Sequence, residues 1–133
     1  MKKEFVQLYH DNTSNLFSIL RHLYYMKSHE IDYGFHLFSQ LTEKIDKDGL
    51  NRAIYIQYHD EMVYSKNKEE HVINNLYKDE ISVLTIKSSY ILVTTNHNYS
   101  SFFTIIQSFS DHFFVCDFNY QDYFWLNEIK MLV

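Results

Sequence analysis

The chain has 133 residues, of which 46% are apolar and 18% aromatic, and its formal net charge is −5. This composition excludes a disordered chain, and the acidic balance argues against a general nucleic-acid binder, which usually carries excess basic residues. Cys116 is the only cysteine, so the chain forms neither an internal disulfide nor a multi-cysteine zinc site. No run of about 18 apolar residues indicates a membrane span, so we expect a soluble, cytoplasmic protein without membrane contact.

The first part of the chain has apolar residues at the three- and four-residue spacing of amphipathic helices. A short helix is predicted over Lys3–His10. A second helix is predicted to be capped by Thr13 or Ser14 and to run to about Lys27. Its inner face is expected to carry Leu16, Ile19, Leu20 and Leu23.

A third helix is predicted after a polar link over Lys27–Asp32. Its inner face is expected to carry Ile31, Phe35, Phe38, Leu41 and Ile45. The polar run from Asp46 to Gly49 is predicted to stop this helix, with Gly49 in a positive-φ conformation.

The second half of the chain changes to a pattern that favours strands. Ala53–Tyr58 and Met62–Tyr64 are predicted to form one hairpin, and Ile81–Ile86 with Tyr90–Thr95 a second. The charged segment Lys66–Lys78 between them is predicted to contain one or two helical turns.

The last third is predicted to form one helix followed by two strands. The helix is expected to be capped by Asn98 or Ser100, and its apolar residues at helical spacing are Phe102, Ile105, Ile106 and Phe109. Phe113–Asn127 has two apolar and aromatic runs around a polar break, which indicates a strand, a turn and a strand. The large indole of Trp125 is expected to lie in or against the core.

Together these elements predict an α+β fold, with N-terminal helices followed by a mostly antiparallel β-sheet packed against helices. Short connections between the strands favour antiparallel pairing. We expect a single domain that spans residues 1–133.

Residues that could support catalysis or bind a metal are present but scattered. The eight histidines show no metal-ligand spacing, so neither a metal nor another cofactor is expected. His59, Asp60 and Glu61 are interpreted as a solvated turn, and Cys116 as a structural thiol within a strand. Catalysis by His59, Asp60 and Cys116 would require all three in one pocket, and we expect a protein that is not an enzyme.

The 12 tyrosines and 11 phenylalanines are numerous enough to serve more than the core. Without interleaved Lys and Arg they do not indicate base stacking, whereas aromatic residues are favoured anchors of protein interfaces. Phe5, Leu8 and Tyr9 on the first short helix are the best candidates for such a surface. The alternative is that these residues pack on the protein's own core.

Two stretches of the sequence carry a family resemblance. Cys116–Asn119 and Tyr123–Asn127 match an apolar strand that ends Asp-Phe-Asn, a short turn, and Tyr-x-Trp-Leu-Asn. Lys3-Glu4-Phe5-x-x-x-Tyr9, followed by Leu16-Phe17-x-x-Leu20, matches a pair of opening helices. The sequence therefore resembles the sporulation inhibitor of replication (SirA) family over nearly its whole length, with specific motifs at the two ends.

The resemblance implies a small, non-enzymatic α/β protein that binds the N-terminal domain of the replication initiator DnaA. Such proteins repress initiation as sporulation begins, and the binding face includes the Phe and Tyr of Glu-Phe-x-x-x-Tyr. By resemblance these are Phe5 and Tyr9, and Gln40 is the nearest match to a Gln of the same face. The expected partner-binding residues are thus Phe5, Leu8, Tyr9 and Gln40, in a chain that is monomeric alone and does not bind nucleic acid directly.

Three features depart from the family pattern. The family has an apolar strand before the Lys-Glu-Phe motif, whereas this sequence begins at Met1. His10–Thr13 replaces Phe-Gly-Arg/Lys-Glu, and Glu128 replaces a Pro. An alternative is therefore a binding module of the same fold, such as a phage-encoded or immunity-type inhibitor, with a different protein partner.

Overall fold

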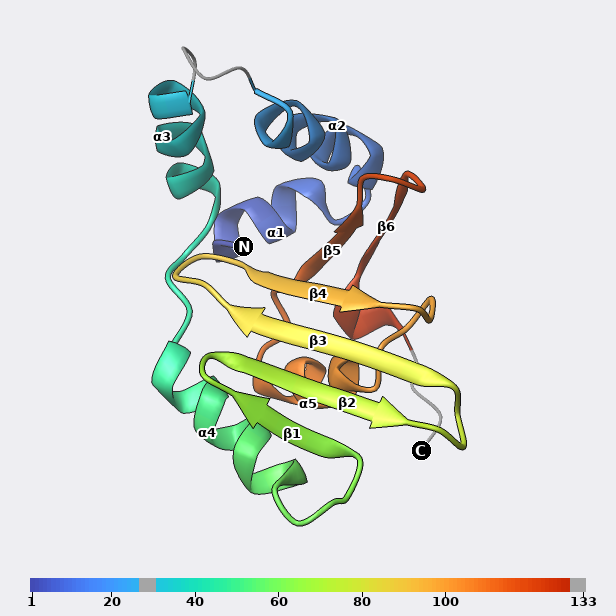
Figure 1. Ribbon diagram of the computed structural model, residues 1–133. Helices are drawn as coiled ribbons and strands as arrows, with labels where there is room; N and C mark the ends of the chain where they lie inside the picture. The colour runs from blue at the N-terminus through green and yellow to red at the C-terminus, as the bar shows by residue number, and fades with distance from the viewer. Residues whose placement is uncertain (27–30, 130–133) are drawn as a thin grey trace. The chain divides into compact units, whose positions relative to one another are not determined.

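The computed structural model describes residues 1–26 and 31–129, and Figure 1 shows their helices and strands. The α-helices are α1 (Lys3–Tyr9), α2 (Thr13–Tyr24), α3 (Ile31–Leu41), α4 (Lys47–Tyr58) and α5 (Phe102–Phe109). The strands are β1 (Tyr64–Asn67), β2 (Glu70–Asn75), β3 (Glu80–Ile86), β4 (Ile91–Thr95), β5 (Phe114–Asp117) and β6 (Asp122–Trp125). A 3₁₀ turn, η2 (Leu126–Glu128), follows β6.

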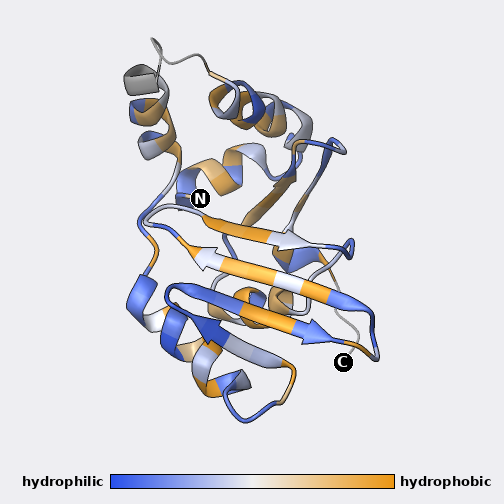
Figure 2. Cartoon of the chain, in the orientation of Figure 1, coloured by the Kyte–Doolittle hydropathy of each residue, from blue (hydrophilic) through white to orange (hydrophobic). Residues whose placement is uncertain are grey.

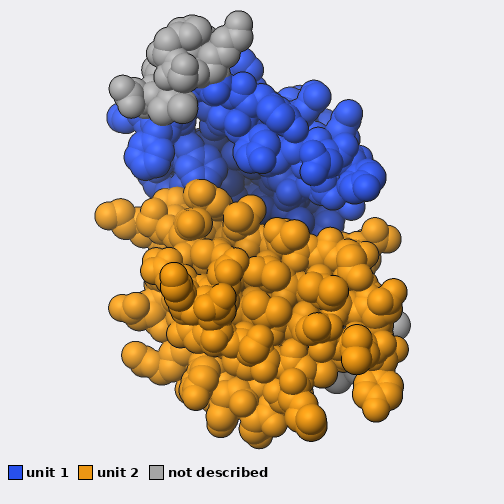
Figure 3. Space-filling model, in the orientation of Figure 1, with its two compact units in different colours: residues 1–43, 111–133 blue, residues 44–110 orange. Residues whose placement is uncertain are grey.

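The chain packs as two compact units (Figure 3). Unit 1 combines residues 1–43 with 111–133, and unit 2 consists of residues 44–110. Unit 2 contains an antiparallel sheet in the order β1-β2-β3-β4, and unit 1 contains the antiparallel pair β5-β6. The predicted α+β class with antiparallel strands is confirmed, whereas the single domain stays a prediction.

In unit 2, α4 and α5 lie on one face of the four-stranded sheet (Figure 1). Buried and more exposed residues alternate along β3, as expected for a strand with one covered face. Figure 2 shows apolar residues concentrated along β3 and α5. The buried apolar residues of this unit are Leu50, Ile54, Ile73, Leu84, Ile86, Phe102, Phe103 and Ile106.

The helix α4 includes Ala53–Tyr58, which was predicted as a strand, and begins within Asp46–Gly49, which was predicted to stop a helix. The side chain of Asp46 caps it by accepting a hydrogen bond from the Gly49 amide at 3.1 Å. Gly49 has no positive φ. A Cβ there would lie 2.3 Å from Asp46 Oδ2, so glycine leaves room for the capping carboxylate. Leu50 and Ile54, four residues apart, bury one face of the helix and outweigh the β-branched and aromatic residues of Ala53–Tyr58.

Lys66–Lys78, predicted to contain helical turns, in fact includes the end of β1, the whole of β2 and part of the turn to β3. The strand β2 pairs with β1 and β3. His71 and Ile73 are buried at the two-residue spacing of a strand. Lys68, between β1 and β2, has a φ of 57°, a conformation that belongs to a tight turn.

Two buried polar side chains in unit 2, His71 and Glu80, have hydrogen-bond partners on both of their polar atoms. Tyr64 Oη lies 2.7 Å from His71 Nδ1, and His71 Nε2 lies 2.6 Å from Asn51 Oδ1. Burial lowers the pKa of His71 to about 4, and Lys66 adds to the effect. Burial raises the pKa of Glu80, but hydrogen bonds from Ser101 and Ser82 outweigh it and leave that pKa below its ordinary value.

In unit 1, α2 packs against the β5-β6 hairpin. Trp125 is 2% exposed and forms a core cluster with Leu16 and Leu20, which confirms its predicted position. Phe17 of α2 stacks on Tyr123 and Phe118, with ring centroids 4.6 and 5.6 Å apart. Aromatic side chains thus join the N-terminal helices to the C-terminal hairpin within this unit.

Several predicted helix ends and faces need correction. Asn12 occupies the N-cap position of α2 in place of Thr13 or Ser14, and no side chain makes a capping hydrogen bond there. The helix α3 ends at Leu41, so Ile45 lies beyond it, and Phe35 is 71% exposed although it was expected to face inward. Residues 27–30 of the predicted link lie outside the described residues.

At α5, the Ser100 hydroxyl accepts a hydrogen bond from the Phe102 amide, while the Ser101 amide donates to the Glu80 carboxylate. The N-cap position itself belongs to Ser101, in place of the predicted Asn98 or Ser100, and Ser100 lies one residue before it. Glu80, a strand residue distant in sequence, also contributes to the helix start, and local sequence gave no sign of this.

Candidate protein-binding surface

The helix α1 is short and has no fully buried residue. Glu4 in its first turn suits the positive end of the helix dipole, but no side chain caps the helix. Its start is held instead by a backbone hydrogen bond from the Lys2 amide to the Leu41 carbonyl, 3.0 Å long. Because so short a helix is marginal alone, packing against the rest of unit 1 must stabilise it.

The two faces of α1 have different surroundings. Val6 and Tyr9 are half-buried and pack against the core cluster of Leu16, Leu20 and Trp125. Phe5 is also half-buried, whereas the Leu8 side chain is exposed, at 63%. Tyr9 thus contributes to the core of unit 1, and Leu8 is the most exposed apolar side chain of α1.

Gln40, on α3, is exposed, and its Nε2 atom lies 3.3 Å from His36 Nε2. Phe38 and Leu41 of the same helix pack against the core cluster, so the helix has a buried and an exposed side. Phe35 belongs to the exposed side together with His36 and Gln40. The sequence prediction missed Phe35 because its helical spacing with Phe38 and Leu41 indicated an inward position.

The backbone bond between Lys2 and Leu41 brings the start of α1 to the end of α3. Phe5 lies within one helical turn of Lys2, and Gln40 directly precedes Leu41. The structure therefore places these two predicted site residues at one junction, whereas Leu8 and Tyr9 lie on the later turn of α1.

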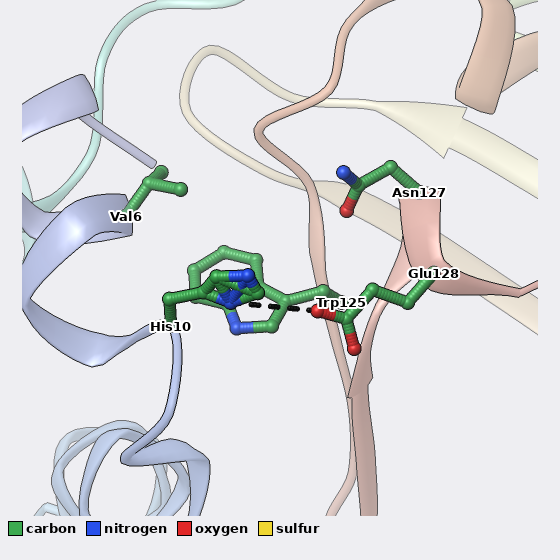
Figure 4. A pocket seen from close by; sticks show the side chains of 5 residues that line it. All are labelled: Val6, His10, Trp125, Asn127 and Glu128. Atoms are coloured by element: carbon green, nitrogen blue, oxygen red, sulfur yellow. Dashed lines mark ion pairs between the residues drawn. The ribbon is translucent and has the colours of Figure 1, made fainter.

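A small cavity of about 30 Å³ lies beside α1 in unit 1 (Figure 4). Val6 and His10 line it from the α1 side, and Trp125, Asn127 and Glu128 line it from the end of β6 and from η2. His10 Nδ1 lies 3.5 Å from Glu128 Oε1. The Nε1–H of Trp125 is buried and has no hydrogen-bond acceptor among the described residues.

The groups considered for catalysis belong to two different units. Cys116 is half-buried in unit 1, and burial raises the pKa of its thiol to about 12, so the nucleophilic thiolate is scarce at neutral pH. His59 and Asp60 are exposed residues of unit 2, where the His59 ring stacks on Tyr55 at 5.1 Å. This arrangement agrees with the interpretation of His59–Glu61 as a solvated turn.

Two features are absent from residues 1–26 and 31–129. Within these ranges, no three His, Cys, Asp or Glu side chains are grouped so that they could hold a metal ion. Within the same part of the chain, no helix has the length and apolar character needed to cross a membrane.

Comparison with protein families identifies a match over nearly the whole chain. The family model described as "Sporulation inhibitor of replication protein SirA" matches residues 1–130. This range includes the α1 helix, Gln40 and the residues that line the cavity. No curated protein matches the chain.

Proposed function

Because the chain belongs to the sporulation inhibitor of replication (SirA) family, we propose that it represses the initiation of chromosome replication by binding the N-terminal domain of DnaA. The family is one of regulatory inhibitors, and its name connects the inhibition of replication with sporulation. Inhibition by binding requires no catalytic group. It is therefore compatible with a protonated Cys116 and an exposed His59.

The exposure of Leu8 is the observation that carries this proposal. Leu8 leaves apolar area in water on a helix whose Val6 and Tyr9 pack against the core cluster, and burial by a partner would release that water. Phe5, half-buried one turn earlier, adds aromatic area, and Gln40 supplies a polar group near the start of α1. An apolar centre with polar groups at its edge is the usual composition of a specific protein interface.

The mechanism we propose is competitive occlusion. The α1 surface occupies a region of the DnaA N-terminal domain that other assembly factors need, so initiation complexes fail to form. The chain contributes a helical surface and undergoes no chemical change. A monomer of this chain is sufficient, because the predicted site residues all belong to unit 1.

The proposal is tested by calorimetric titration of the isolated DnaA N-terminal domain, from the same organism, with the whole protein. We expect saturable binding by the wild type. Leu8→Ala should weaken binding at least about tenfold, because truncating an interface anchor costs more than about 1.4 kcal/mol. The melting temperature should stay nearly unchanged, since Leu8 is mostly exposed.

Leu76 provides a matched control. It is another exposed leucine, at 87%, but it lies in the turn between β2 and β3 of unit 2. Leu76→Ala should therefore leave DnaA binding unchanged. Equal losses of affinity from Leu8→Ala and Leu76→Ala would refute the proposed surface. Absence of binding by the wild type would refute the proposed partner.

A further inference from the structure

Trp125, which lines the cavity beside α1, has a hydrogen-bond donor that folding leaves unpaired. The Trp125 side chain is 2% exposed, and its Nε1–H finds no acceptor among the described residues of the chain. Most buried polar groups in proteins are paired, because an unpaired buried donor costs free energy. A phenylalanine would fill much of the same apolar space without that cost. We therefore expect the N–H to have a role besides packing.

The wall of the cavity offers acceptors as well as this donor. Glu128 contributes a carboxylate and Asn127 an amide oxygen, and both follow Trp125 closely in the chain. A volume of about 30 Å³ exceeds what a single water needs and suits a group of a few atoms. The cavity lies beside Val6 and His10, which are four residues apart on one side of α1. A partner that docks on α1 would reach it past His10, whose side chain is 55% exposed.

We propose that this cavity is a subsite for a carboxamide side chain, Asn or Gln, of the partner. The carboxamide oxygen accepts a hydrogen bond from Trp125 Nε1, and its NH₂ group donates to the Glu128 carboxylate. Glu128 would repel a carboxylate, and an ammonium or guanidinium group has no acceptor to offer the indole. The inference rests on the proposed function, because it takes the DnaA N-terminal domain as the partner.

Access to the indole N–H requires one side chain to move. Trp125 Nε1 is sealed from solvent. His10 is the wall residue best able to move, because its side chain is 55% exposed and its pair with Glu128 is a long one of 3.5 Å. Both side chains line the same small cavity, and their rings overlap in the view of Figure 4. Rotation of His10 also frees Glu128 to accept from the entering NH₂ group.

The experiment compares the wild type with three variants in titrations with the DnaA N-terminal domain. Trp125→Phe removes the donor and keeps an aromatic ring, so it should weaken binding at least about tenfold while the chain stays folded. Glu128→Ala should also weaken binding, because the NH₂ group loses its acceptor. Phe114→Leu, which changes the ring packed 4.8 Å from the indole but keeps the N–H, should leave the affinity unchanged.

The wild-type protein supplies a measurement that does not depend on the stability of a variant. Trp125 is the only tryptophan, so its indole N–H gives a single NMR resonance that should shift and become protected from exchange on binding. Normal wild-type binding with an unchanged indole resonance would overturn the subsite alone. A loss for Trp125→Phe but not for Glu128→Ala would indicate a lone acceptor and overturn the carboxamide. Absence of wild-type binding would overturn both the subsite and the proposed function.

Discussion

Single residues of this protein divide sharply between core and surface even within one short helix. Tyr9 and Leu8 are neighbours in sequence, yet Tyr9 packs on the core cluster of unit 1 while Leu8 is mostly exposed. The spacing of four between Phe5 and Tyr9 predicts a shared aromatic patch, but it does not reveal how much of each ring the protein itself covers. The exposed Leu8 is therefore the cleaner residue for a test of binding.

Tyr9→Ala should lower the free energy of unfolding by about 2 kcal/mol, because it removes a half-buried ring from the core cluster. Tyr9→Phe keeps the ring and should unfold at nearly the wild-type urea midpoint. Chemical denaturation of both variants measures the difference. Wild-type stability of Tyr9→Ala would mean that Tyr9 serves the interface alone.

His71 should make the stability of the protein depend on pH. Its pKa falls from 6.5 to about 4 in the folded state, so the unfolded chain binds a proton first as the pH decreases. The contribution of His71 to the free energy of unfolding is complete above pH 6.5. As the pH falls from 6.5 to about 4, that free energy decreases by up to about 3 kcal/mol.

Urea unfolding at pH 7.5 and pH 5 measures this loss, with His71→Gln as the control that cannot take up a proton. The variant should be less stable at pH 7.5, because it disturbs the bonds to Tyr64 and Asn51. Its stability should also change less between the two pH values. An equal pH dependence in wild type and variant would contradict the assignment to His71.

At the scale of elements, the helix α4 shows what local sequence predicts poorly. The β-branched and aromatic residues of Ala53–Tyr58 favour a strand, whereas the cap at Asp46 and the buried pair Leu50 and Ile54 favour a helix. The helix signals at Asp46 and Leu50 come before Ala53–Tyr58, the segment with strand-like residues. A longer window that included residues 46–50 would have predicted the helix.

Asp46→Ala should destabilise the protein by about 1 kcal/mol, because it leaves the Gly49 amide without its capping acceptor. Asp48→Ala is the matched control, since Asp48 is an exposed carboxylate in the same first turn of α4. Its removal affects the helix dipole only and should cost less than half as much. Thermal unfolding of both variants makes the comparison, and equal losses would show that the cap is not the stabilising contact.

Other elements were predictable because their signals were local and consistent. The helix α5 has its apolar residues at strict helical spacing, and β3 with β4 surrounds a short polar turn. The strand β2 was missed because its charged neighbours hid the alternation of His71 and Ile73. At the candidate site, motifs at the two ends of the chain indicated α1 and Trp125. The unpaired indole N–H and the exposure of Phe35 depend on tertiary packing and required the structure.

At the scale of the whole molecule, the order of the two units along the chain predicts cooperative unfolding. Unit 1 is built from both ends of the chain, and unit 2 is inserted between them. Unit 1 therefore forms only when residues distant in sequence come together, and each unit is small for a stable independent core. We expect one transition in scanning calorimetry with equal calorimetric and van't Hoff enthalpies, whereas two separate transitions would contradict the predicted single domain.

The most direct test of the central claim is to follow the backbone amide resonances of the whole protein while the isolated DnaA N-terminal domain is added. We expect saturable shifts in α1 and in the last turn of α3, around Gln40, with smaller changes in the β1–β4 sheet. Amide resonances that stay unchanged, or that shift only within residues 44–110, would refute binding of DnaA through α1.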